Sequence, residues 1–122
     1  MEDKFKEMWV QQIEFIKLLQ EKRGFPSCPV DIKTKQGQNF LKGLTHECMH
    51  ELFEANQCLK NGKDHRVTDV KDFNYDDYIV ELVDSFHYLL EIAIMSGVSL
   101  DEFYNSYMKK GIVNIKRINE GY

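Results

Sequence analysis

The sequence predicts an all-α fold, a bundle of four helices in a single domain that spans residues 1–122. Three observations predict it. Apolar residues recur at three- and four-residue steps in separate segments, glycine or proline marks the segment ends, and no stretch alternates apolar and polar residues as a half-buried strand does. Of the 122 residues, 43% are hydrophobic and 30% are charged, which suits one domain with a modest core.

The first half of the chain predicts two helices with a loop between them. One helix is expected from Lys4 to Lys22, where the apolar spacing is helical and a glycine and a proline follow the end. The stretch GFPSCPVDIKTKQGQ has two prolines, two glycines and no sustained period, so it predicts a connecting loop. The next helix is expected from Gln38 to Leu59, ended by Asn61 and Gly62.

The second half predicts two more helices with a short connection. The segment from Tyr75 to Ser96 is apolar over most of its surface, so this helix is expected to be central. Gly97 can end it in the left-handed conformation. The residues Ser99–Glu102 fit a capping box, which predicts the start of a last helix that runs to about Arg117.

Composition excludes several classes of function. The formal charge is −4 and no block is rich in lysine or arginine, which argues against a nucleic-acid partner. No apolar run approaches the roughly 20 residues that span a bilayer, so no membrane association and a cytoplasmic location are expected. The cysteines Cys28, Cys48 and Cys58 form no CxxC pair, so they predict neither a disulfide framework nor a zinc knuckle.

One short motif points to a zinc protease. His46, Glu47 and His50 match the pattern H-E-x-x-H, in which two histidines hold zinc and the glutamate activates water. Zinc proteases of this kind also need a third ligand and normally a longer chain, and neither is evident. We therefore interpret the match as coincidental and both histidines as residues of a helix surface.

Acidic spacing around that motif indicates a different metal. One predicted helix carries three glutamates at steps of four and three, and the following one carries an i, i+3 acid pair inside an otherwise apolar segment. These acids are Glu47, Glu51 and Glu54, then Glu81 and Asp84, with Glu91 along the same side. Unpaired buried carboxylates are costly, and a divalent ion would relieve their repulsion. All-carboxylate ligands favour Mg²⁺, or Mn²⁺, over zinc. The alternative is that the acids pair with lysines or face solvent.

An ordered set of segments carries a family resemblance. HECMHELFEA, then ELVDSFHYLLEIA, then KKGIVNIKR resemble the all-α NTP pyrophosphatase superfamily, which includes MazG-like enzymes, dimeric dUTPases and phage dCTPases. Glutamates 47 and 51 match the outer acids of its first motif, and the pair 81 and 84 matches its E-x-x-D motif. Its later K-x-x-x-N-x-x-R element is matched by Lys110, Asn114 and Arg117.

The resemblance implies a four-helix MazG-like bundle that is completed by oligomerisation, as a homodimer or homotetramer. It implies Mg²⁺ at Glu47, Glu51, Glu81 and Asp84, with Glu51 or Glu47 as general base and the K-x-x-x-N-x-x-R residues on the substrate. One departure leaves an alternative open: the family's E-x-x-E pair would place its first member at Cys48, and the alternative pair is Glu51 and Glu54.

The resemblance also implies the reaction. It is Mg²⁺-dependent hydrolysis of a deoxynucleoside triphosphate to the monophosphate and pyrophosphate. The ending RINEGY looks like the dUTPase and dCTPase branch, so dUTP is the first expected substrate and dCTP the second. The alternatives are a purine or broad-specificity MazG-like NTP pyrophosphatase, and a non-enzymatic helical interaction protein.

Overall fold

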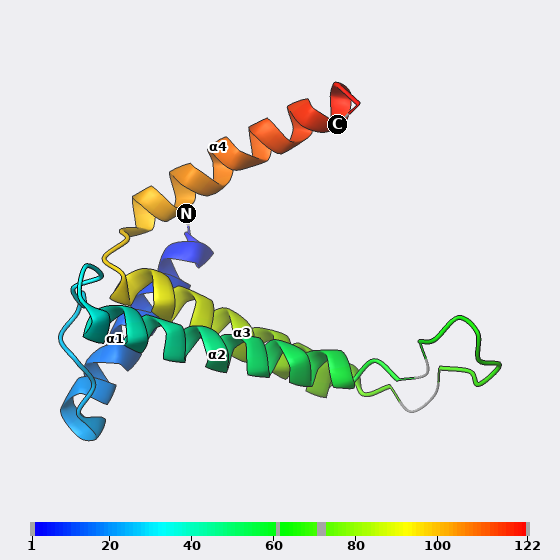
Figure 1. Ribbon diagram of the computed structural model, residues 1–122, viewed down its shortest axis with the longest axis horizontal. Coiled ribbons are helices and arrows are strands. Elements are labelled where there is room, and N and C mark those ends of the chain that lie inside the picture. The colour runs from blue at the N-terminus through cyan, green and yellow to red at the C-terminus, as the bar shows by residue number, and fades with distance from the viewer. Residues whose placement is uncertain (1, 61, 71–72, 122) are drawn as a thin grey trace. The chain divides into compact units, whose positions relative to one another are not determined.

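The computed structural model describes residues 2–60, 62–70 and 73–121, and Figure 1 shows its helices. They are α1 (Lys4–Arg23), α2 (Lys35–Gln57), α3 (Tyr75–Met95) and α4 (Leu100–Asn119). These described ranges contain no strand, so the all-α prediction with four helices is confirmed. Among these residues no helix has the length and apolar character that crossing a bilayer requires.

The chain forms two compact units that share α3. The α1–α4 unit comprises Met1–Val30 and Ala93–Tyr122, and the α2–α3 unit comprises Asp31–Ile92. Each contains buried apolar side chains. They are Trp9, Ile16, Ala93, Ile94 and Met95 in the α1–α4 unit, and Leu44, Ala55 and Leu90 in the α2–α3 unit.

In the α1–α4 unit, three aromatic rings join the first turns of α1 and α4. The Trp9 ring centroid lies 6.0 Å from that of Phe5 and 5.8 Å from that of Phe103. Trp9 is only 4% exposed, so its role here is packing. The connection after α1 is held to the end of α3, because the Val30 amide donates to the Met95 carbonyl at 2.9 Å.

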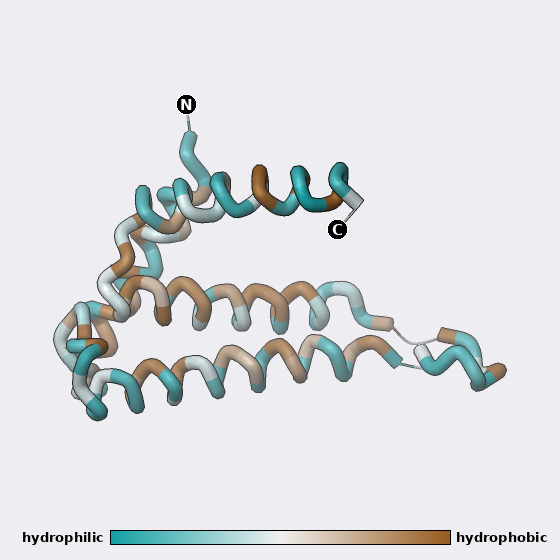
Figure 2. The backbone as a smooth tube through the Cα atoms, turned by 45° about the horizontal axis from the view of Figure 1, so that its top comes forward, coloured by the Kyte–Doolittle hydropathy of each residue, from teal (hydrophilic) through white to brown (hydrophobic). Residues whose placement is uncertain are grey.

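In the α2–α3 unit, the two helices run side by side in opposite directions (Figures 1 and 2). The Cys48 thiol of α2 donates to the Ser85 carbonyl of α3 at 3.2 Å. Ser85 and Ala55 are small and buried. Small side chains at these points allow the two helices to pack closely, and the contact between Cys48 and Ser85 shows which turns of α2 and α3 lie opposite each other.

The start of α2 differs from the prediction, because the helix begins at Lys35 and not at Gln38. Thr34 provides the cap: its hydroxyl accepts from the Gly37 amide at 3.0 Å and donates to the Asp31 carbonyl at 2.8 Å. A local side-chain cap can extend a helix into a segment without apolar period, which explains the three additional residues.

The end of α2 also differs from the prediction, whereas the end of α3 and the start of α4 follow the predicted chemistry. The end of α2 is at Gln57, two residues before the predicted Leu59, and Asn61 lies outside the described residues. Gly97 follows α3 with a φ of 89°, as expected for a left-handed helix end. The capping box at the start of α4 is confirmed, with the Glu102 amide 3.1 Å from the Ser99 hydroxyl and the Glu102 carboxylate 3.3 Å from the Ser99 amide.

Candidate metal centre

Three acidic side chains meet between α2 and α3. Glu51, Glu81 and Asp84 each offer a carboxylate oxygen, and these oxygens lie within 4.8 Å of one another. All three residues are half-buried. We call them the carboxylate cluster. It is the one group of potential metal ligands of this kind among the described residues.

Helical spacing explains why these three residues meet. Cys48, Glu51 and Ala55 follow one another at three- and four-residue steps, so they share the face of α2 that contacts α3. On α3, Glu81 and Asp84 are separated by one turn, and the Ser85 carbonyl accepts from the Cys48 thiol. Cys48 therefore packs between the helices, where burial raises the pKa of its thiol.

Glu81 has the least favourable environment for a negative charge. Its Oε2 oxygen is inaccessible to solvent and has no hydrogen-bond donor among the described residues. The pKa of Glu81 is raised to about 7 from an ordinary value of 4.5. Desolvation is the largest cause, and the neighbouring carboxyl groups of Glu51 and Glu54 raise the pKa further. In the absence of a cation, the cluster therefore favours a proton on Glu81.

The two other glutamates of α2 differ in their relation to the cluster. Glu54 is half-buried, and it contributes to the raised pKa of Glu81, but it is not one of the three cluster residues. Glu47 is exposed, and it is not among the three residues whose oxygens lie within 4.8 Å. Its charge acts on Tyr88, the pKa of which is raised first by burial and then by Glu47.

Glu91 continues the acidic side of α3 beyond the cluster. It follows Asp84 by two turns, with Tyr88 between them. Glu91 is only 3% exposed, and burial raises the pKa of its carboxyl to about 7. The sequence signal was an acid within an apolar segment, but no motif assigned Glu91 to a site.

The remaining predicted site residues belong to the α1–α4 unit. Lys110, Asn114 and Arg117 lie on α4 at steps of four and three, so they form one stripe along that helix. All three are exposed. The carboxylate cluster belongs to the α2–α3 unit, so the two groups of predicted residues come from different units.

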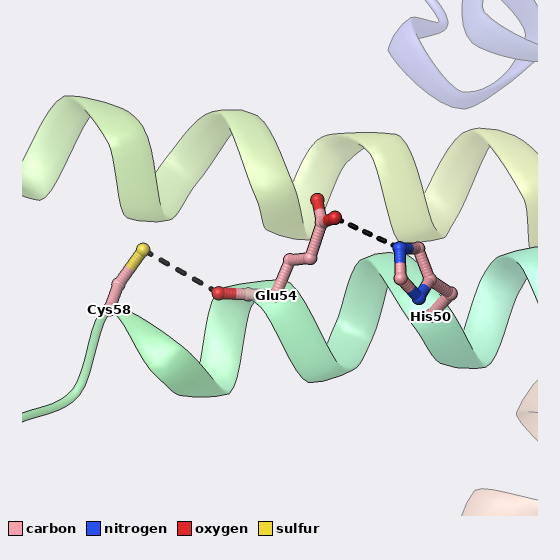
Figure 3. Close-up of polar contacts among 3 residues, drawn as sticks. All are labelled: His50, Glu54 and Cys58. Atoms are coloured by element: carbon pink, nitrogen blue, oxygen red, sulfur yellow. Dashed lines mark hydrogen bonds and ion pairs between the residues drawn. The ribbon is translucent and has the colours of Figure 1, made fainter.

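The histidines of the H-E-x-x-H motif do not belong to the carboxylate cluster. His46 is exposed on α2. His50 lies one turn later, and its Nε2 atom is 3.0 Å from the Oε1 atom of Glu54. Figure 3 shows this contact together with the Cys58 thiol, which lies 3.7 Å from the Glu54 carbonyl oxygen at the end of α2. His50 therefore pairs with the carboxylate of Glu54 on its own helix.

Comparison with known proteins gave no match. No family model matches the chain, and neither the curated proteins nor the solved structures include one with significant similarity to it.

Proposed function

We propose that this protein is a Mg²⁺-dependent nucleoside triphosphate pyrophosphohydrolase. The observation that carries the proposal is the carboxylate cluster, in which oxygens of Glu51, Glu81 and Asp84 lie within 4.8 Å of one another. The motif resemblance supplies the reaction: water hydrolyses the bond between the α- and β-phosphates, which gives a nucleoside monophosphate and pyrophosphate.

The donor set suits a hard divalent ion. All cluster ligands are carboxylate oxygens, which Mg²⁺ and Mn²⁺ prefer. The Glu81 Oε2 atom lacks a donor, and a cation would satisfy it. When bound, such an ion neutralises phosphate charge and lowers the pKa of a nearby water. The ligands in the proposal are Glu51, Glu81 and Asp84, with Glu47 or Glu54 as the further acid of α2.

The protein's own groups have distinct roles in this proposal. The carboxylates of the cluster would hold the cation, and Glu51 or Glu47 accepts a proton from the attacking water. The motif resemblance assigns phosphate contacts to Lys110 and Arg117, and an arginine can contact two phosphate oxygens at once. Asn114 binds a phosphate or sugar oxygen through its amide.

For the substrate we propose a pyrimidine deoxynucleotide, with dUTP preferred and dCTP second. The support is the resemblance of ELVDSFHYLL and NIKRINEGY to the dUTPase and dCTPase branch. A small pocket can reject purines by size. It can also distinguish uracil from cytosine at the 4-position, because a mismatched buried polar group costs ~1–3 kcal/mol.

The proposal includes a cytosolic homodimer or homotetramer. Its support is the exposed apolar surface of the α2–α3 unit, where Met49, Leu52 and Phe53 of α2 are 62%, 52% and 59% exposed. Together with Tyr78 and Leu82 of α3 they line an open apolar groove. Exposed apolar surface of this kind is typical of an interface between protein chains.

The direct test is pyrophosphate release from dUTP, dCTP, dATP and dGTP by the purified full chain, with Mg²⁺ and with a chelator. We expect Mg²⁺-dependent release that is fastest with dUTP. Glu81→Gln and Asp84→Asn should each abolish it while the helical circular dichroism spectrum is retained. Arg117→Ala should slow all four triphosphates alike, because a guanidinium reads phosphate charge and not the base.

The possible outcomes separate the parts of this proposal. Absence of hydrolysis in the wild type would refute the enzymatic function and favour a helical interaction protein. Full turnover in both acid variants would refute the assignment of the site. Equal or faster cleavage of dATP or dGTP would refute only the pyrimidine preference.

A further inference from the structure

The last helix, α4, carries an apolar stripe that faces solvent. The residues of this stripe recur at three- and four-residue steps, so they lie on one side of the helix. They are Tyr104, Met108, Ile112, Ile115 and Ile118, each at least 47% exposed. The structure describes all of Leu100–Asn119, and none of these residues is buried. We call this surface the α4 stripe. Exposed apolar surface of this kind is typical of a site of protein interaction.

A glycine halfway along α4 also points to a close neighbour from outside the chain. Gly111 is three residues after Met108 and four before Ile115, so it lies within the α4 stripe. Glycine inside a helix is less stable than alanine. A Cβ atom added at Gly111 would meet nothing within 4 Å, so packing within the chain does not require the glycine. A glycine at this point allows a second backbone to approach the stripe closely.

The charges of α4 suit a second copy of the same helix that runs in the opposite direction. Asp101 and Glu102 lie in the first turn, and Lys116 and Arg117 lie in the last. Two parallel copies would place like charges side by side, whereas two antiparallel copies place the acidic end of each against the basic end of the other. The spacing of fifteen residues, about four turns, also puts Asp101 and Lys116 on the same flank of the stripe.

We propose that α4 pairs in antiparallel fashion with α4 of a second copy of this chain. The two α4 stripes pack together, and Asp101 of each copy faces Lys116 of the partner subunit. A helix of this length extends about 30 Å, so the pair forms a long interface with two-fold symmetry. This interface is separate from the exposed apolar surface of the α2–α3 unit, and a chain that uses both forms an assembly larger than a dimer. It requires neither the cation site nor the proposed reaction.

The first experiment is sedimentation velocity of the full chain with a charge introduced on either side of α4. Ile115→Glu should shift the protein to a smaller species, because the carboxylate would be buried in the interface. The matched control is Val113→Glu, which helical spacing places on the opposite side of α4 and which should sediment like the wild type. Ile115→Glu combined with Phe53→Glu should give a monomer, because both proposed surfaces are then disrupted.

Charge reversal tests the antiparallel direction. Asp101→Lys alone, or Lys116→Glu alone, turns two attractive contacts in each pair of helices into repulsive ones. Each variant should weaken self-association about tenfold, a modest change because such contacts lie at the exposed edge of the interface. An equimolar mixture of the two variants should regain the association of the wild type, because both contacts between unlike copies are then attractive. Circular dichroism of each variant checks that α4 remains helical.

The outcomes separate this interface from the rest of the proposed assembly. If Ile115→Glu sedimented like the wild type, or if Val113→Glu caused an equal shift, the α4 interface would be overturned while the α2–α3 surface stood. Loss of thermal stability in Ile115→Glu without a change in sedimenting mass would place the stripe against its own chain and would also overturn the inference. Wild-type association in both charge variants would overturn the antiparallel pairing. A monomeric wild type would overturn both interfaces.

Discussion

At the scale of single residues, the main feature is acidic side chains in places that penalise their charge. Glu81 has an oxygen without access to solvent, and Glu91 is 3% exposed. The pKa of each carboxyl is raised to about 7. An apolar side chain would pack at these places without the cost of a buried carboxyl, so packing alone does not account for these acids.

These raised pKa values predict how stability depends on pH in the metal-free protein. Between about pH 4.5 and pH 7, the folded chain retains protons on Glu81 and Glu91 that the unfolded chain releases. The free energy of unfolding should therefore fall as the pH rises through this window. Urea denaturation of the wild type, Glu81→Gln and Glu91→Gln at intervals from pH 4.5 to 8 measures it. Each variant should show a smaller fall than the wild type.

A matched control and a ligand complete this test. Glu14→Gln, an exposed position on α1, should leave the pH dependence unchanged. Saturating Mg²⁺ at pH 8 should restore stability to the wild type, because a ligand that binds only the folded state stabilises it. If the free energy of unfolding of the wild type fell no more than that of Glu81→Gln and Glu91→Gln, the charge-penalising environment assigned to these two acids would be contradicted.

At the scale of elements, two glycines of α2 differ in the space that surrounds them, and so in what a larger side chain would do to stability. A Cβ atom added at Gly37 would overlap the backbone carbonyl of Asp31, with the carbonyl carbon only 2.7 Å away. At Gly43, by contrast, an added Cβ meets nothing within 4 Å. The first glycine therefore permits the tight turn at the start of α2, whereas the second only weakens the helix.

Paired alanine substitutions should show this difference. Gly37→Ala should destabilise the protein by about 1–3 kcal/mol, because the overlap forces the turn at Asp31 to shift. Gly43→Ala should stabilise it by up to about 1 kcal/mol, because alanine favours an exposed helix interior. Urea unfolding at constant pH measures both. Equal effects of the two substitutions would mean that the turn at Asp31 adapts without cost.

At the scale of the whole molecule, exposed apolar side chains on the α2–α3 unit are the main feature. They include Met49, Leu52 and Phe53 on α2 and Val80 and Val83 on α3, each at least 46% exposed. Figure 2 shows how much of both helices is apolar. The proposed homo-oligomer would cover this surface, and a stable interface commonly buries about 800 Å² on each partner.

Disruption of that surface should change the oligomeric state. Phe53→Glu introduces a charge into the apolar face of α2, so we expect a shift from dimer or tetramer toward monomer in sedimentation velocity. The melting temperature of the wild type should rise with protein concentration, and that of the variant should depend on concentration less. Val67→Glu, in the loop after α2 and 99% exposed, is the control. A monomeric wild type would contradict the proposed assembly.

Local patterns in the sequence predicted most of the secondary structure. The starts of α1 and α3 and the capping box of α4 match the structure, because caps and apolar spacing act over a few residues. The start of α2 was wrong by three residues, because the Thr34 cap acts where no apolar period is visible. The acids of α2 and α3 were also identified from their spacing.

What the sequence by itself determined is therefore the four helices and the acidic faces of α2 and α3. Spacing on one helix cannot rank Glu47 against Glu54, because both lie near the same face as Glu51. Tertiary structure decided that Glu51, Glu81 and Asp84 meet between α2 and α3, whereas Glu47 is exposed. The physical reason is that the close packing of Cys48 against Ser85 fixes which turns of the two helices are opposite.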